Sequence, residues 1–253
     1  MHRSGTSFMA NLLKDSGLFI GDRLAGATPS NVKGHFEDID ILEFHERMLK
    51  TNNTTMYLHQ DRKMILTPQF YHEAETIVAR RNEKHQLWGF KQPRATLFLD
   101  LWKVVLPSAM YIVSFRHPSA VINSIIRREA NKLILRNDEK TGPKLKANYL
   151  QNLSDHAARY DAMNAVHLKR LINFHRSYDR SKIHFVNFDE IGTEVGRLQN
   201  FLNAYHIHLT LDKIESLFSE KLLIKPEEHQ VSEQDVSARS MRLYNEILDL
   251  SKS

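Results

Sequence analysis

The sequence lacks cysteine and long apolar runs, and each absence removes a class of protein. Without cysteine the chain can form neither disulfides nor thiolate metal sites, which fits a reducing, cytoplasmic location. No apolar run approaches ~18 residues, so we expect no membrane span. No basic and then apolar leader precedes the first motif, and we expect no secretory signal. We also find no internal repeat and no low-complexity stretch among the 253 residues.

What the chain does contain is typical of one globular domain over residues 1–253. It is 42% hydrophobic and 26% charged, which is enough apolar surface for a sizeable core. The 35 Lys and Arg residues outnumber the 30 Asp and Glu residues, and this excess favours an anionic partner. Aromatic and basic residues do not interleave as on a nucleic-acid-binding face, so we expect no nucleic-acid partner.

Apolar runs that read as strands alternate with helical patterns along the chain. The clearest is MYIVSF at residues 110–115, with shorter runs at 18–20, 87–91 and 183–188. Such alternation predicts an α/β protein with a central, mainly parallel sheet flanked by helices. Residues 131–147 are charged, aperiodic and contain Gly-Pro, so we expect a mobile surface loop. The expected helices cover residues 8–15, 39–49, 68 onward, 95–105, 119 onward, 150–175, 195–202 and 236 onward.

The chain opens on Arg-Ser-Gly-Thr-Ser at residues 3–7, directly before a helical pattern. A helix N-terminus behind a glycine turn aims backbone N–H groups and the positive end of the helix dipole at one point. The hydroxyls of Ser4, Thr6 and Ser7 add hydrogen-bond donors. Gly5 permits close backbone approach, and Arg3 supplies a planar, permanently charged fork. The motif predicts phosphate binding, without the lysine and spacing of the nucleoside-triphosphate P-loop.

Two further points bear on this opening motif. The strand that should feed such a loop would precede Met1, so we expect a first strand that is missing from this chain. The alternative interpretation of the motif is an ordinary capped helix, because Ser and Thr are common N-cap residues.

A second candidate anion site follows the run at residues 110–115. Arg116 ends this strand, Pro118 fixes the turn, and Ser124 lies about two helical turns further on. Both polar side chains can converge at the carboxyl edge of the sheet, where open α/β sheets bind ligands. Two anion sites on adjacent strands predict a ligand with two separated phosphates.

Together the two motifs resemble those of the sulfotransferase family that uses 3′-phosphoadenosine 5′-phosphosulfate. The first is RSGTS, and the second has the form R-x-P-x-x-V-x-x-S, from Arg116 to Ser124. The resemblance implies that residues 3–7 hold the 5′-phosphosulfate end, and that Arg116 and Ser124 hold the 3′-phosphate. It also implies a P-loop-like, three-layer form of the predicted fold.

Two later segments are similar to the same family. GFKQPR at residues 89–94 resembles the Lys-Asp-Pro element of the protein-tyrosine and bacterial branches, with Gln92 in place of the usual acid. HFVNFDEI at residues 184–191 resembles the late strand and acidic turn. The lysine- and glycine-rich cofactor loop of the cytosolic small-molecule branch does not occur. The resemblance therefore favours the bacterial, carbohydrate-modifying or protein-modifying branches, and a bacterial source.

The resemblance implies an in-line sulfuryl transfer, in which a base accepts the proton of the acceptor hydroxyl. We assign the base to Glu37, which falls between the phosphate loop and the next helix, where the resemblance to the more distant branches implies a catalytic glutamate. Asp38 and His35 are alternatives, although Asp38 also suits the cap of that helix. Arg3 and Lys91 would stabilise the charge that develops on the transferring group and the departing phosphate.

Other polar residues near the motifs have ordinary alternatives. Arg94 suits either an acceptor carboxylate or Glu37, and the pair Arg127-Arg128 suits either the nucleotide or a solvated basic face. His206 and His208 alternate with apolar residues, as in a half-buried strand. They have no carboxylate partner at zinc-site spacing, so we expect no metal site.

The acceptor pocket would be built from residues 50–66 and 131–147, whose polar side chains form no motif that identifies the acceptor. By resemblance we expect a hydroxyl on a carbohydrate or another large polar acceptor. Two other functions stay open: a P-loop nucleotide or small-molecule kinase, and a non-catalytic nucleotide- or glycan-binding relative. The kinase would need the missing lysine and magnesium carboxylates. Gln92 and the missing first strand keep the non-catalytic relative open.

Overall fold

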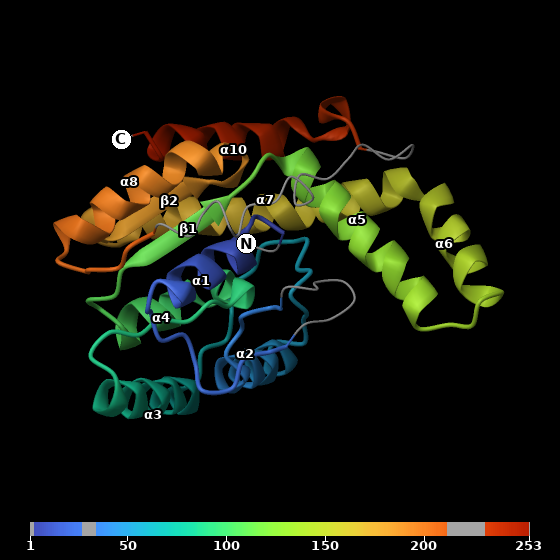
Figure 1. The fold of residues 1–253 in the computed structure, drawn as a ribbon. Helices are drawn as coiled ribbons and strands as arrows, with labels where there is room; N and C mark the ends of the chain where they lie inside the picture. The colour runs from blue at the N-terminus through green and yellow to red at the C-terminus, as the bar shows by residue number, and fades with distance from the viewer. Residues whose placement is uncertain (1–2, 27–33, 212–230, 253) are drawn as a thin grey trace.

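Two parallel strands lie at the centre of the structure, a computed structural model that describes residues 3–26, 34–211 and 231–252. Strands β1 (Tyr111–Phe115) and β2 (Ile183–Asn187) pair in parallel, as their apolar runs predict (Figure 1). The α-helices are α1 (Thr6–Asp15), α2 (Ile39–Thr51), α3 (Pro68–Lys84), α4 (Leu99–Val105), α5 (Pro118–Leu135), α6 (Thr141–Gln151), α7 (Leu153–Ser177), α8 (Ile191–Ala204) and α10 (Ala238–Leu250). Short 3-10 helices are η1 (Pro93–Leu97), η2 (Arg180–Lys182), η3 (Phe188–Glu190) and η5 (Glu233–Asp235).

Helices pack on both faces of this strand pair. Alternate side chains of a strand point to opposite faces. Ile112 and Val186 accordingly belong to the core formed with α1 and α8. Val113 and Phe185 belong to the core formed with α7 and α10. The chain is therefore a mixed α/β protein, as predicted.

Two of the predicted strands are reduced to a single bridge. Residues 18–20 and 87–91 meet where Phe19 pairs with Trp88 in parallel, and the Gly89 N–H donates to the Phe19 carbonyl at 2.9 Å. Within the described ranges the sheet has two strands, so the larger sheet predicted from these runs is not formed there. Strands gain stability from pairing along several residues, which an apolar run alone does not provide.

The segment predicted as a surface loop, residues 131–147, is largely helical. The end of α5 and the start of α6 form a hairpin that lies to one side of the sheet (Figure 1). Asp138 starts α6, because its carboxylate accepts two backbone N–H groups at 2.9 Å. Gly142 lets the helices approach, since a Cβ there would lie 2.9 Å from the Ile134 Cα. Pro143 falls in the first turn of α6, where proline does not break a helix.

The other helices keep most of their predicted bounds. Asp38 caps α2 by accepting the Asp40 N–H at 3.0 Å, and Thr67 caps α3. The helix predicted at residues 95–105 is divided into η1 and α4 at Phe98, whose φ of −128° is not helical. The half-buried strand predicted around His206 is instead an irregular turn after α8, in which that residue has a φ of 56°.

A separate hydrophobic core joins α2, α3 and α4, which lie together in Figure 1. The Trp102 indole N–H donates to His45 Nε2 at 3.0 Å, and the other ring nitrogen of His45 lies 2.8 Å from the Ile41 carbonyl. Burial lowers the pKa of His45 to about 3, so the ring stays neutral and serves as a hydrogen-bond partner. These contacts fix α2, and therefore the short segment that precedes it and carries Glu37.

Candidate active site

The opening loop is held by residues that follow it by more than a hundred positions. Ser4 is fully buried, and its carbonyl accepts a hydrogen bond from the Ser114 hydroxyl in β1. Gly5 has a φ of 76° and lies against the ring of Phe188, which a Cβ at this position would overlap. Both facts require glycine here. The N-terminus of α1 begins directly behind, so its positive dipole end points at the loop.

Arg3 joins the two sequence motifs. Its Nε donates to the Ser124 hydroxyl in α5 at 2.8 Å, although the residues are 121 positions apart. Its backbone has a φ of 61°, a conformation that costs energy outside glycine and is concentrated at functional sites. Burial lowers the pKa of Arg3 to about 10, and repulsion from Arg128, Arg127 and Arg116 contributes to the same shift. The two predicted anion sites therefore share one positive field.

Arg116, at the end of β1, is held by the turn after β2. Its Nε lies 2.7 Å from Asp189 Oδ1, and its guanidinium lies 5.7 Å from the centre of the Phe188 ring. The second oxygen of Asp189 accepts the backbone N–H of His117 at 2.8 Å. Phe188 supports both Arg116 and Gly5, so the late acidic turn positions both motifs at once.

Glu37 is the centre of a buried polar network. The Lys91 ammonium donates to Oε1 at 2.8 Å, and the Gln92 amide donates to Oε2 at 3.3 Å. Arg94 also binds Oε2 at 3.3 Å and pairs with Glu46 at 2.6 Å. Of the two partners considered for Arg94, the structure shows Glu37. Burial raises the pKa of Glu37, but Lys91 and Arg94 together outweigh it and hold this pKa below its usual value.

The backbone carbonyl of His35 connects this network to the opening loop. It accepts the Ser7 hydroxyl at 3.4 Å and the Lys91 ammonium at 2.9 Å. Burial lowers the pKa of His35, so its ring is neutral at pH 7. Phe36, between His35 and Glu37, has a φ of 52°, which makes this the second strained turn of the region. The predicted base and the predicted phosphate loop therefore lie side by side.

Asp38, the alternative base, occupies an enclosed position. Its side chain is 2% exposed, caps α2 and lies 2.6 Å from the Arg81 guanidinium. Gly21 packs against it so closely that a Cβ there would lie 2.6 Å from its carboxylate oxygen. Of the two roles that the sequence allows for Asp38, the structure shows the helix cap.

A model of the sulfotransferase family matches residues 1–197, a range that includes both motifs, Glu37 and the late acidic turn. The chain belongs to the sulfotransferase family. It is therefore an enzyme that transfers sulfuryl groups, as the two motifs predict. No curated protein and no solved structure matches it.

Tyr57 and Arg128 lie near Arg3, because the charges of both affect the pKa of Arg3, although Tyr57 carries no signal in the sequence. The Tyr57 hydroxyl donates to Glu129 at 2.9 Å and also accepts a hydrogen bond from Arg128. The Arg128 side chain is 10% exposed, so it does not lie on a solvated basic face. No local pattern could report a contact between residues 71 positions apart.

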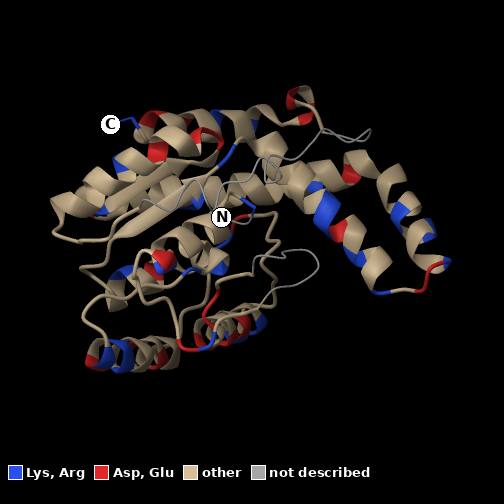
Figure 2. Cartoon of the chain, viewed as in Figure 1, with Lys and Arg blue, Asp and Glu red and all other residues tan. Residues whose placement is uncertain are grey.

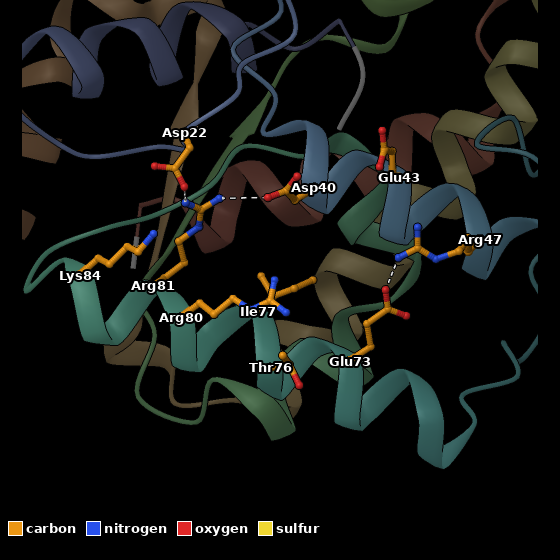
Figure 3. A pocket seen from close by; sticks show the side chains of 10 residues that line it. All are labelled: Asp22, Asp40, Glu43, Arg47, Glu73, Thr76, Ile77, Arg80, Arg81 and Lys84. Atoms are coloured by element: carbon orange, nitrogen blue, oxygen red, sulfur yellow. Dashed lines mark hydrogen bonds and ion pairs between the residues drawn. The ribbon is translucent and has the colours of Figure 1, made fainter.

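A cavity of about 410 Å³ lies elsewhere in the sulfotransferase, between α2 and α3 (Figure 3). Many of its charges pair with one another, as Arg47 does with Glu73 and Arg81 with Asp22. A cavity with as many acids as bases does not select an anion, and no motif residue lines it. Its walls are Asp22, Asp40, Glu43, Arg47, Glu73, Thr76, Ile77, Arg80, Arg81 and Lys84.

Two further features concern only the residues that the structure describes. Over those ranges, no helix combines the length and the apolar character needed to cross a membrane. The same ranges contain no group of three or more His, Asp or Glu side chains arranged to hold a metal ion.

Proposed function

We propose that this sulfotransferase uses 3′-phosphoadenosine 5′-phosphosulfate as its donor and transfers the sulfuryl group to an acceptor hydroxyl. The contact between Arg3 and Ser124 carries the proposal, because it unites the two anion motifs within one hydrogen bond. The loop of residues 3–7 would hold the 5′-phosphosulfate, and Arg116 and Ser124 would hold the 3′-phosphate. The nucleotide product is 3′-phosphoadenosine 5′-phosphate.

The charges of the site suit a ligand with two phosphates. Repulsion among arginines contributes to the low pKa of Arg3, and bound anions would relieve that repulsion. The Ser124 hydroxyl accepts its bond from Arg3, so it can still donate its own hydrogen to a phosphate oxygen. Asp189 engages Arg116 at Nε, and a guanidinium has four further N–H donors.

The chemistry follows from the network around Glu37. When bound, the donor supplies a sulfuryl group on a phosphate leaving group. Glu37 accepts the proton of the acceptor hydroxyl while the new S–O bond forms and the bond to the nucleotide phosphate breaks. Lys91, at 2.8 Å from Glu37, turns toward the sulfuryl oxygens, which both stabilises their charge and frees the carboxylate to act as a base.

We also propose a fold, an acceptor class, a source and a cellular location for this enzyme. A P-loop-like, three-layer arrangement over a single domain is supported by the packing of α1 and α8 on one face of the strand pair, and of α7 and α10 on the other. A carbohydrate acceptor and a bacterial source are supported by the motif resemblance. A cytoplasmic location is supported by the absence of cysteine.

Thermal unfolding with 3′-phosphoadenosine 5′-phosphate tests the donor. At ~100 times its dissociation constant, this ligand should raise Tm by about 5 to 10 °C, because binding adds about 2.7 kcal/mol to the folded state. Arg116→Ala should remove most of the shift. ATP with magnesium is the matched control and should give none. A Tm shift with ATP and magnesium but not with 3′-phosphoadenosine 5′-phosphate would favour the kinase. No Tm shift with either nucleotide would contradict the donor assignment.

Ser124→Ala separates donor binding from chemistry. We expect the dissociation constant of 3′-phosphoadenosine 5′-phosphate to rise about tenfold, because one hydrogen bond to a charged group is lost. The limiting kcat should change little. Isothermal titration calorimetry measures the first effect and steady-state kinetics the second. Ser119→Ala, in the same helix but bonded to His117, is the control and should bind normally. Equal losses in both variants would contradict the assigned role.

A further inference from the structure

The hairpin of α5 and α6 ends in an apolar tip. The described residues include six large apolar side chains that are strongly exposed, and three of them lie here. They are Ile134, Leu135 and Leu145, which are 39%, 54% and 37% exposed. The tip has a defined shape, because Gly142 packs against the α5 backbone at Ile134. A group of exposed apolar side chains on a fixed support is typical of an interaction surface.

Basic residues lie close in sequence to these three side chains, and blue segments mark them along α5 and α6 (Figure 2). Arg136, Lys140 and Lys144 are all exposed. The acids of the tip are Glu139 and Asp138, and the Asp138 carboxylate is occupied in capping α6. Lys132 pairs with Glu129 at 2.9 Å. The remaining basic residues are Arg136, Lys140, Lys144 and Lys146, so the tip still carries net positive charge.

We propose that this tip docks on a lipid bilayer with anionic headgroups. Apolar side chains that enter the boundary between headgroups and acyl chains, with cations that bind the headgroups, are the combination that holds proteins at such a surface. A polyanionic chain would satisfy the cations and leave the apolar side chains in water. A second copy of the tip would bring like charges together. Of these three partners, only the bilayer uses both features.

The tip and the sulfuryl-transfer site share one helix. α5 carries Ser124 near its start and Leu135 at its end, which are about 17 Å apart at 1.5 Å per residue. Docking would therefore hold the site close to the surface and favour acceptors attached to it. Docking itself does not depend on the proposed donor, so either proposal can fail without the other.

Flotation with phosphatidylcholine vesicles, with and without phosphatidylserine, tests the proposal. The full chain should bind only the vesicles with phosphatidylserine, and added salt should weaken the binding. The variant Arg136→Gln/Lys140→Gln/Lys144→Gln should lose about a hundredfold in partitioning, from roughly fivefold for each cation. The variant Ile134→Ser/Leu135→Ser/Leu145→Ser should lose roughly thirtyfold in partitioning, because it no longer has the three apolar side chains that would enter the bilayer.

Two matched controls use exposed residues elsewhere. Ile65→Ser/Val104→Ser removes apolar side chains that are more exposed than those of the tip, at 57% each. Arg239→Gln/Arg242→Gln/Lys252→Gln removes exposed cations of the C-terminal region. Both should bind vesicles as the parent chain does. Circular dichroism and the nucleotide-induced Tm shift, recorded on every variant, report folding and donor binding separately from docking.

Three results would overturn the proposal. The first is no binding to vesicles with phosphatidylserine. The second is binding that the apolar variant leaves unchanged, together with equal capture by heparin, which would indicate a polyanionic chain. The third is a dimer in sedimentation velocity that the apolar variant dissociates, which would indicate a second copy.

Discussion

Glu37→Gln should lower kcat by about 10²–10⁴-fold while 3′-phosphoadenosine 5′-phosphate still binds. Glutamine keeps the size of the side chain and can accept the hydrogen bond from Lys91, but it cannot take a proton from the acceptor. The phosphate loop does not depend on this carboxylate, since its Ser4 carbonyl is held by Ser114 and its Gly5 by Phe188. A sulfuryl-transfer assay and calorimetry on the same preparation measure the two quantities.

Glu46→Gln is the matched control for Glu37→Gln. Glu46 is the other carboxylate bound by Arg94, but it is 53% exposed and does not contact Lys91. Its loss should leave kcat nearly unchanged. If Glu37→Gln kept full transfer, the base would lie elsewhere, with His35 the next candidate.

The pH dependence of transfer gives the same assignment a second test. Lys91 and Arg94 hold the pKa of Glu37 below its usual value, against the effect of burial. A base must be deprotonated to act, so activity should persist as the pH falls and be lost only below about 4.5, the ordinary value for glutamate. The pH profile of kcat/KM reports this pKa in the free enzyme. An acid limb between pH 4.5 and pH 6.5 would instead indicate His35, whose pKa is lowered from 6.5 by burial.

Arg81→Met should cost about 3–5 kcal/mol of folding free energy and lower Tm by about 6–20 °C. Arg81 is 5% exposed and lies 2.6 Å from Asp38, which is 2% exposed. Removing one partner of a buried ion pair leaves the other charge buried without compensation. Differential scanning calorimetry measures the effect directly.

Arg23→Met is the control for this prediction, because Arg23 pairs with Asp40 at 2.5 Å but is 60% exposed. Exposed pairs contribute about 0–1 kcal/mol, so its Tm should change little. Burial raises the pKa of Asp38, and Arg81 offsets that effect in part. Without Arg81 this pKa rises further, and protonation then relieves the buried charge. The Tm deficit of Arg81→Met should therefore narrow as the pH falls toward 3.8, the ordinary value for aspartate.

The sequence predicts the structure best at positions where a polar residue ends a strand or begins a helix. Arg116 follows an apolar run that can only be a buried strand, so its place at the sheet edge is set locally. Thr67 and Asp38 precede helical patterns and cap them in the structure. Gly5 lies in a motif that predicts a close approach of the backbone from local chemistry alone. The sequence does not predict that the ring of Phe188 is the partner in this contact.

Contacts between distant segments are what the sequence does not predict. The bond between Tyr57 and Arg128 joins a loop without a motif to the middle of a helix. The charge of residues 131–147, their lack of a period and their Gly-Pro pair predict a loop, which is wrong. The Asp138 carboxylate and the close packing at Gly142 instead support the start of α6. The strands expected at 18–20 and 87–91 are reduced to one bridge for the same reason, since strand pairing depends on neighbouring strands rather than on composition.

The support of the opening loop by Ser114 and Phe188 has a consequence for how the enzyme is made. The first motif leaves the ribosome before the groups that shape it, which are synthesised more than a hundred residues later. Closing such long loops is slow compared with forming local helices. During synthesis the core around α2, α3 and α4 can therefore form before any donor site exists. A nascent sulfotransferase should acquire nucleotide affinity only after residues 183–189 have emerged.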